Sequence, residues 1–161
     1  MERKTAQRQG KTLILGVGNL LLQDEGVGVH AIQALAKLAW PEQVNLQEGA
    51  TAGLDLLYLV EGYARLIVID AVRAGGKPGT LYRFTPADVI AQRPALTSLH
   101  QVGLLDALAL ARELGQAPAQ VVIIGVEPKS MAWGMELSPE VQAALPQIIE
   151  RVREEIGKLG D

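Results

Sequence analysis

The sequence predicts an α/β protein, a three-layer sandwich in which helices cover both faces of a mostly parallel, five-stranded twisted sheet with one antiparallel strand. Short apolar runs rich in branched residues alternate with longer amphipathic stretches, which is typical of β-α-β units around a parallel sheet. The 161 residues are enough to bury a substantial core and fit one domain. We therefore expect residues 1–161 to form a single domain, with a flexible N-terminal segment at residues 1–11.

The first two strands and helices are expected in the first third of the chain. Thr12–Val17 is almost entirely apolar, as a central strand covered on both faces should be. Apolar residues recur at helical spacing over Val27–Ala39, and Trp40-Pro41 should end that helix. Val44–Gln47 reads as a short strand, and Thr51 can cap the helix that follows it.

Three further strands are expected downstream. Leu66–Ile69 is a buried strand that ends at Asp70. Thr80–Phe84 alternates like a strand with one buried face, and no crossover helix separates it from the preceding strand. Because a short loop cannot return the chain for parallel pairing, we expect Thr80–Phe84 to run antiparallel. Val121–Gly125 is the last expected strand.

Two helices in the second half have recognisable starts. Ser98 and Gln101 fit a capping box, which puts His100 in the first helical turn. Ser138-Pro139 opens the last helix with a cap followed by proline. Apolar residues line one face of this helix, and Pro146 inside it should kink or split it, because proline lacks an amide donor.

The composition is that of an ordinary soluble globular protein and argues against several partners. Hydrophobic residues make up 48% and charged residues 20% of the chain, and the formal net charge is -3. Such a chain offers no broad positive field for nucleic acid, and its longest apolar runs are far shorter than a membrane span. The absence of cysteine excludes disulfides, thiolate zinc sites and a cysteine nucleophile, and agrees with a cytoplasmic location.

The glycine-rich stretch after the first strand invites comparison with nucleotide-binding loops. Gly16 to Leu21 lacks the third glycine of the dinucleotide fingerprint, and the nearest acid that closes a strand is Glu48, beyond the usual spacing. No lysine followed by serine or threonine comes after the glycines, so there is no P-loop. The loop continues into Asp24 and Glu25, which would repel a phosphate and attract a cation.

Glu25, Asp70 and His100 form the candidate site. We expect each of them at the junction between one secondary-structure element and the next. Open α/β sheets bind their ligands at the strand ends, near a topological switch point. A helix N-terminus disfavours the protonated form of His100, which keeps the imidazole available. Two carboxylates and one imidazole suit a divalent metal whose coordination sphere stays partly open.

Simpler roles exist for the same residues. Asp24 or Glu25 can cap the first helix, Asp70 can be satisfied by nearby amides, and His100 can be a surface histidine, as we expect for His30.

The surrounding loops also have simpler interpretations. Gly16, Gly18 and Asn19 are expected to shape a tight turn that needs positive φ and close backbone approach, and Thr51 fits a cap better than a catalytic hydroxyl. The loop Glu127–Met135 carries two methionines and a tryptophan, which either grip a partner or form a small core beneath the loop. We favour the small core.

The chain contains several short blocks in order: Leu15-Gly16-Val17-Gly18-Asn19 with Asp24-Glu25-Gly26-Val27-Gly28-Val29, then Gly49-Ala50-Thr51-Ala52-Gly53, Ile69-Asp70-Ala71 and Leu99-His100-Gln101-Val102-Gly103-Leu104. In this order and spacing the blocks resemble the hydrogenase maturation endopeptidases. The similarity extends from about Leu13 to about Val152, which is essentially the whole domain. Where the family often has an aspartate before two glycines, this chain has Glu48-Gly49-Ala50.

The resemblance implies a single peptidase domain that trims the large subunit of nickel-iron hydrogenases. Glu25, Asp70 and His100 would then be both the metal ligands and the catalytic residues. The metal would be the substrate's own nickel, recognised before the C-terminal extension is cut, and other divalent cations could replace it. We also expect Asn19, Thr51, Gly53 and Trp133 to contact the substrate.

We therefore expect a metal-dependent endopeptidase that removes the C-terminal extension of a nickel-loaded hydrogenase large-subunit precursor, as a cytoplasmic monomer without nucleic-acid or membrane partners. The metal would polarise the scissile carbonyl or lower the pKa of a bound water. A self-contained zinc protease is not expected, because no helix carries two histidines at i and i+4. The alternatives are a non-catalytic nickel-binding assembly factor and a nucleotide-binding α/β domain.

Overall fold

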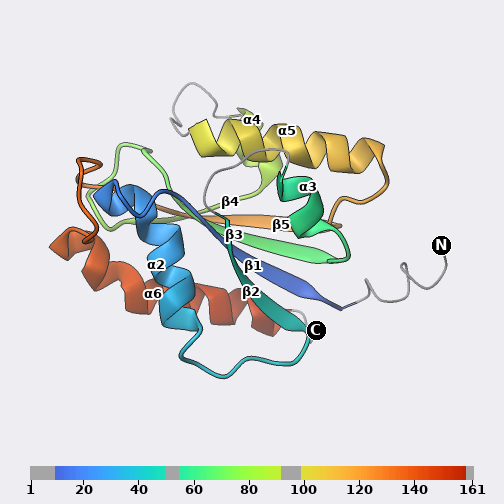
Figure 1. The fold of residues 1–161 in the computed structure, drawn as a ribbon, viewed down its shortest axis with the longest axis horizontal. Helices are drawn as coiled ribbons and strands as arrows, with labels where there is room; N and C mark the ends of the chain where they lie inside the picture. The colour runs from blue at the N-terminus through green and yellow to red at the C-terminus, as the bar shows by residue number, and fades with distance from the viewer. Residues whose placement is uncertain (1–9, 50–54, 92–98, 159–161) are drawn as a thin grey trace.

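A computed structural model describes residues 10–49, 55–91 and 99–158, with the backbone alone at 89–91 and 99–102. Within these residues a five-stranded sheet has the order β2-β1-β3-β5-β4 (Figure 1). Its strands are β1 (Thr12–Val17), β2 (Val44–Gly49), β3 (Arg65–Ala71), β4 (Leu81–Phe84) and β5 (Gln120–Val126). All pairs are parallel except the edge pair β4–β5, which is antiparallel. The predicted mixed sheet and the predicted antiparallel strand are confirmed.

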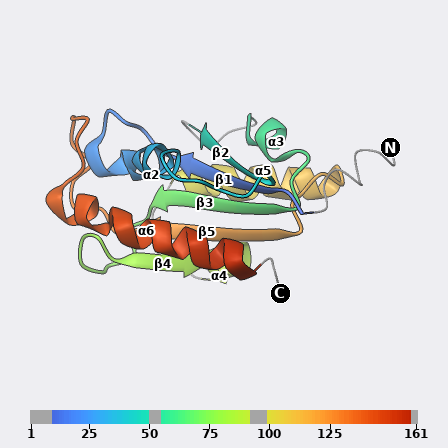
Figure 2. The same ribbon diagram turned by 90° about the horizontal axis from the view of Figure 1, so that it is seen from below.

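Helices on both faces of the sheet complete three layers (Figures 1 and 2). One face carries α2 and α6, and the other carries α3 and α5, while α4 lies beside β4. The bounds are η1 (Gln23–Gly26), α2 (Val27–Leu35), α3 (Asp55–Val60), α4 (Pro86–Ala91), α5 (Leu99–Glu113) and α6 (Pro139–Gly157). The short 3-10 turn η1 leads directly into α2. No helix in the described part of the chain is long and apolar enough to cross a membrane.

β1 and β3 are buried at every residue, as their apolar sequences predict. Their side chains alternate between two separate cores. Ile14 faces the core formed with α2 and α6, whereas Leu13 and Leu15 face the core formed with α3 and α5. The parallel register, with Gly16 opposite Ile69, makes both strands end at the same edge of the sheet.

The first long helix is shorter than its sequence pattern predicts. α2 ends at Leu35 rather than near Ala39, so the predicted C-terminus is wrong. The indole Nε1 of Trp40 donates a hydrogen bond of 2.8 Å to the Leu35 carbonyl, and Leu38 N donates to the same carbonyl at 3.0 Å. These bonds replace the helical bonds that would have continued α2.

α6 begins as predicted but is not divided by its internal proline. Ser138 Oγ accepts a bond of 3.4 Å from Val141 N, and Pro139 is the first helical residue. Of the kink or split predicted at Pro146, the split is wrong, because α6 is one continuous helix (Figure 2). Pro146 and Gln142 lie on the exposed side, where water can bind the carbonyl that lost its donor. The predicted caps Thr51 and Ser98, and residues 1–9, lie outside the described residues.

Candidate active site

Two residues of the predicted site, Glu25 and Asp70, lie on elements that meet where β1 and β3 end. β2 lies on one side of β1 and β3 on the other, so the switch point falls between β1 and β3. Asp70, the penultimate residue of β3, is buried, and its Oδ1 accepts a bond of 2.8 Å from Ala71 N. Glu25 is half-buried in η1, which packs against β3. The fold thus brings the elements that carry Glu25 and Asp70 together.

Glycines allow α2 to begin against the ends of these strands. A Cβ on Gly28 would meet the carbonyl oxygens of Ile69 and Val17 and lie 2.6 Å from Val17 N, which a side chain could not occupy. Gly16 faces the Gly28 carbonyl across the same contact, and Gly18 has φ +143°. The predicted tight turn is confirmed, with positive φ at Gly18 and close approach at both Gly16 and Gly18.

Asp24 is fully buried and anchors η1 to the loop between β5 and α6. Its Oδ2 accepts hydrogen bonds from Lys129 N at 2.9 Å, Ser130 N at 3.0 Å and Ser138 Oγ at 2.8 Å. Its Oδ1 accepts a bond of 2.8 Å from Ser138 N. Bonds to an ionised acceptor are stronger than neutral ones, so this carboxylate fixes the position of the turn that carries Glu25.

Neither acid of the pair caps the first helix. The N-cap of α2 is Gly26, so the prediction that Asp24 or Glu25 is the N-cap residue is wrong. The surface position expected for His30 is also wrong. His30 is half-buried, and its Nε2 is a buried atom without a hydrogen-bond partner among the described groups.

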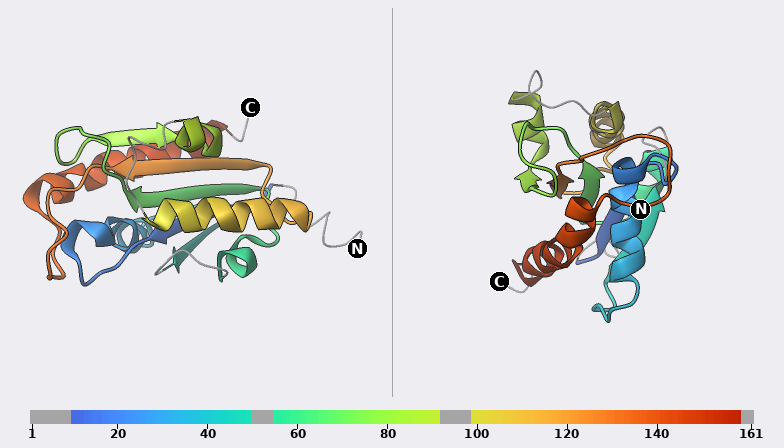
Figure 3. Two further views of the ribbon diagram at one scale, coloured as in Figure 1. Left: turned by 90° about the horizontal axis from the view of Figure 1, so that it is seen from above. Right: turned by 90° about the vertical axis from the view of Figure 1, so that its left-hand side faces the viewer.

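The residues just before η1 are held in a constrained loop. Asn19 Oδ1 accepts a bond of 2.9 Å from Leu21 N, so Asn19 shapes the turn as predicted. Gln23 has φ 46°, a left-handed conformation that costs a residue with a side chain about 1–2 kcal/mol. Gln23 N donates to Gly134 O at 2.8 Å, and Gly134 N donates to Leu21 O at 2.9 Å. These bonds hold the β1–α2 and β5–α6 loops side by side (Figure 3).

The β5–α6 loop divides between the core and the surface. Met131 packs against the core of α2 and α6, as the predicted small core requires. That prediction is wrong for Trp133 and Met135, which are 80% and 61% exposed. Leu21, held next to Gly134, is 49% exposed. Leu21, Trp133 and Met135 are called the apolar patch below.

Sequence reasoning missed Glu127, which organises the loop between β3 and β4. Its buried carboxylate accepts bonds from Gly76 N at 2.7 Å, Ala74 N at 3.0 Å and the Tyr82 hydroxyl at 3.2 Å. Burial raises the pKa of Tyr82, and the charge and hydrogen bond of Glu127 raise this pKa further. Glu127 directly follows an apolar strand. An acidic residue at the end of an apolar strand is the same sequence signal that pointed to Asp70.

His100 is the second residue of α5, in the first turn as predicted, but its side chain lies outside the described part, as do Thr51 and Gly53. Glu48 is exposed near the end of β2 and pairs in register with Gly16. Among the side chains that the structure describes, no group of three His, Cys, Asp or Glu could hold a metal ion. The metal set with His100 therefore stays a prediction.

The molecule is thus an α/β protein that has carboxylates at the switch point of its sheet, where β1 and β3 end. A family model described as hydrogenase maturation protease matches residues 29–155, so the chain belongs to the hydrogenase maturation protease family. Its activity is accordingly that of a protease, a hydrolase that cuts peptide bonds.

Known proteins of this family are similar along nearly the whole chain. The hydrogenase 2 maturation protease of Escherichia coli is 37% identical over 144 residues, which are 88% of each chain. The hydrogenase expression/formation protein HupD of Rhodobacter capsulatus is 40% identical over 89% of this chain and 70% of its own length. The solved structure of the hydrogenase maturating endopeptidase HybD from E. coli matches with a TM-score of 0.78 and 36% identity, covering 90% of this chain and 93% of that one.

Proposed function

We propose that this protease removes the C-terminal extension of a nickel-loaded hydrogenase large-subunit precursor and that Glu25, Asp70 and His100 bind the nickel carried by that substrate. The observation that carries the proposal is the packing of η1 against β3, which brings Glu25 and Asp70 to the switch point of a protein from a maturation protease family. The protein would work as a monomer in the cytoplasm, and other divalent cations could replace nickel.

In this proposal the metal belongs to the substrate, and the protein supplies ligands in a fixed position. Carboxylate oxygens and imidazole nitrogen are suitable ligands for a divalent cation and leave room for ligands from the precursor. The cation would either polarise the scissile carbonyl or lower the pKa of a bound water. Asp24 supports both routes, because its hydrogen bonds hold the turn that carries Glu25.

The precursor is also proposed to contact the apolar patch. Exposed tryptophan and methionine side chains are typical of protein interfaces, and Trp133 and Met135 lie on the loop that is bonded to the segment before Glu25. Asn19, Thr51 and Gly53 complete the proposed contacts with the precursor. An extended peptide held there would lead from the folded precursor toward the strand ends.

The decisive experiment is mass spectrometry of a purified precursor after incubation with the protein. We expect a shortened chain from nickel-loaded precursor and an intact chain from nickel-free precursor. Glu25→Gln, Asp70→Asn and His100→Ala should each reduce cleavage at least about 100-fold while circular dichroism stays that of the native fold. Equal cleavage by the native protein and the His100→Ala variant would remove the three ligands from the proposal. Nickel binding with no shortened product would instead favour an assembly factor.

The docking part has its own matched pair of variants. Trp133→Ser should raise the KM for the precursor about tenfold with little change in kcat, because it removes binding area away from the reacting bond. Tyr58→Ser is the control, since Tyr58 is 78% exposed on α3, on the other face of the sheet. An equal KM effect in both variants would contradict docking at the apolar patch.

A further inference from the structure

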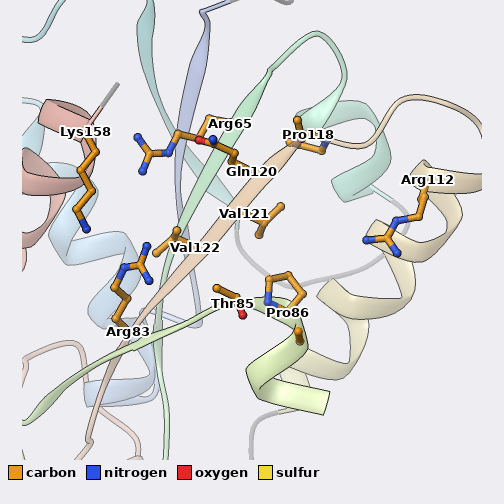
Figure 4. A pocket seen from close by; sticks show the side chains of 12 residues that line it. Arg65, Arg83, Thr85, Pro86, Arg112, Pro118, Gln120, Val121, Val122 and Lys158 are labelled. Atoms are coloured by element: carbon orange, nitrogen blue, oxygen red, sulfur yellow. The ribbon is translucent and has the colours of Figure 1, made fainter. Parts of the chain in front are cut away.

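A pocket lies at the opposite end of the strands from the candidate active site. It has a volume of about 540 Å³, which is within the range of small-molecule sites. Arg65 begins β3 and Gln120 begins β5, so the pocket opens where the parallel strands start. Its floor includes Val121 and Val122 of β5, and Pro86 and Pro118 form part of its walls (Figure 4).

Basic side chains from four different segments line this pocket. Arg65 and Arg83 come from β3 and β4, Lys158 follows α6, and Arg112 reaches over from α5 (Figure 4). The chain as a whole has a formal net charge of -3, so this concentration of positive charge runs against its overall balance. Figure 4 places Arg83 and Lys158 on one side of the pocket and Arg112 on the other.

The acids near these cations leave a positive excess. Glu155 is buried and pairs with Arg65 at 2.7 Å, with Arg83 at 2.5 Å and with Lys158 at 3.4 Å. One carboxylate thus forms ion pairs with three cations. Asp88 is exposed and attracts Arg83. Its side chain accepts hydrogen bonds from Thr85 N and Thr85 Oγ1.

Arg112 adds a further positive charge to the pocket. No hydrogen bond or ion pair joins its guanidinium to any other group in the described part of the chain. The balance of Arg65, Arg83, Arg112 and Lys158 against Glu155 and Asp88 is two positive charges. A dianion would neutralise this excess, and guanidinium groups match the oxygen geometry of phosphate.

We propose that this pocket binds a small phosphate-bearing molecule, with its dianion in the field of Arg83, Arg112 and Lys158 and its organic part on the apolar floor. The site lies at the strand starts, whereas Glu25 and Asp70 lie at the strand ends, so this binding is separate from peptide cleavage. Arg65 is occupied by Glu155, including a bond to the Glu155 carbonyl, and serves to hold the positive cluster in place.

The test is a titration of the full-length protein with phenyl phosphate, inorganic phosphate and benzoate, followed by amide chemical shifts of Gln120 and Val121. At about 150 mM salt, where diffuse surface attraction is screened, phenyl phosphate should saturate these shifts in the millimolar range or below. Inorganic phosphate should bind more weakly, because it lacks the apolar part, and benzoate should bind at least about tenfold more weakly than phenyl phosphate, because it carries one charge.

Variants make the assignment specific. Arg112→Gln and Lys158→Gln should each weaken phenyl phosphate binding about tenfold and lower the melting temperature by no more than about 2 °C, since both side chains are exposed and an ion pair such as Lys158–Glu155 at the surface contributes little. Arg153→Gln, on the exposed surface of α6, is the matched control and should leave binding within about twofold. The proposal is overturned by an absence of saturable shifts up to about 20 mM, by equal weakening in the control, or by equal binding of benzoate and phenyl phosphate.

Discussion

Replacing Asp24 by asparagine tests the structural role of the Asp24 carboxylate, which is distinct from the role proposed for its neighbour Glu25 in the candidate site. Asparagine keeps one acceptor oxygen, which can still bind Ser138 N, but it turns an NH₂ group toward the donors now bound to Oδ2. The Ser138 hydroxyl can rotate to accept, whereas the amides of Lys129 and Ser130 lose their acceptor. Each such donor to a charged acceptor is worth about 1.5 kcal/mol or more, so Asp24→Asn should lower the free energy of unfolding by about 3 kcal/mol.

Urea unfolding and calorimetry measure this effect. For a domain of this size, about 3 kcal/mol corresponds to a fall in Tm of roughly 6–12 °C. The control is Asp106→Asn, the same substitution at an exposed position of α5, which should change stability by less than about 0.5 kcal/mol. If Asp24→Asn lowered Tm by less than about 2 °C with an unchanged m value, the anchoring role derived from its hydrogen bonds would be refuted.

Two further predictions follow from packing and charge. Burial alone would raise the pKa of Glu155, but Arg83, Lys158 and Arg65 outweigh it and hold this pKa below its usual 4.5. The ion-pair contribution is therefore full above about pH 4.5 and is lost as pH falls through the folded pKa, so Glu155→Gln should cost about 3 kcal/mol at pH 7 and progressively less below pH 4.5. A cost independent of pH would contradict the charge argument. Gly28→Ala should destabilise by at least about 2 kcal/mol despite the better helix propensity of alanine, because its Cβ would press on backbone atoms. Gly157→Ala, with nothing within 4 Å of its Cβ, should be neutral or stabilising, and equal melting temperatures for the two variants would disprove the close contact.

The elements that the sequence predicted correctly are those with a strong local signal. Thr12–Val17 and the apolar centre of β3 were predicted as buried strands, and every residue in them is buried. The antiparallel β4 followed from a loop too short for a crossover. The end of α2 was missed because it depends on the indole of Trp40 folding back on Leu35, which the apolar pattern does not encode.

The roles of the acids were harder to predict. Asp24 and Glu25 are adjacent in sequence and look equally suited to a cap or a metal site. Only the fold separates them, because the donors that satisfy Asp24 lie 105 to 114 residues further along the chain. Glu127 was missed for the same reason, since its partners at Ala74 and Gly76 precede it by about fifty residues.

The sequence by itself determined the fold class and the family of this protein, because apolar periodicity and ordered motifs are carried by residues close together in the chain. The tertiary structure decided which acids are structural and where positive charge gathers. Those properties depend on groups that meet only when distant segments pack, as Asp24 meets Ser138 and as Arg112 reaches the pocket beside Arg83. Hydrogen bonds and charges act over a few ångströms in space, and only the folded chain sets those distances.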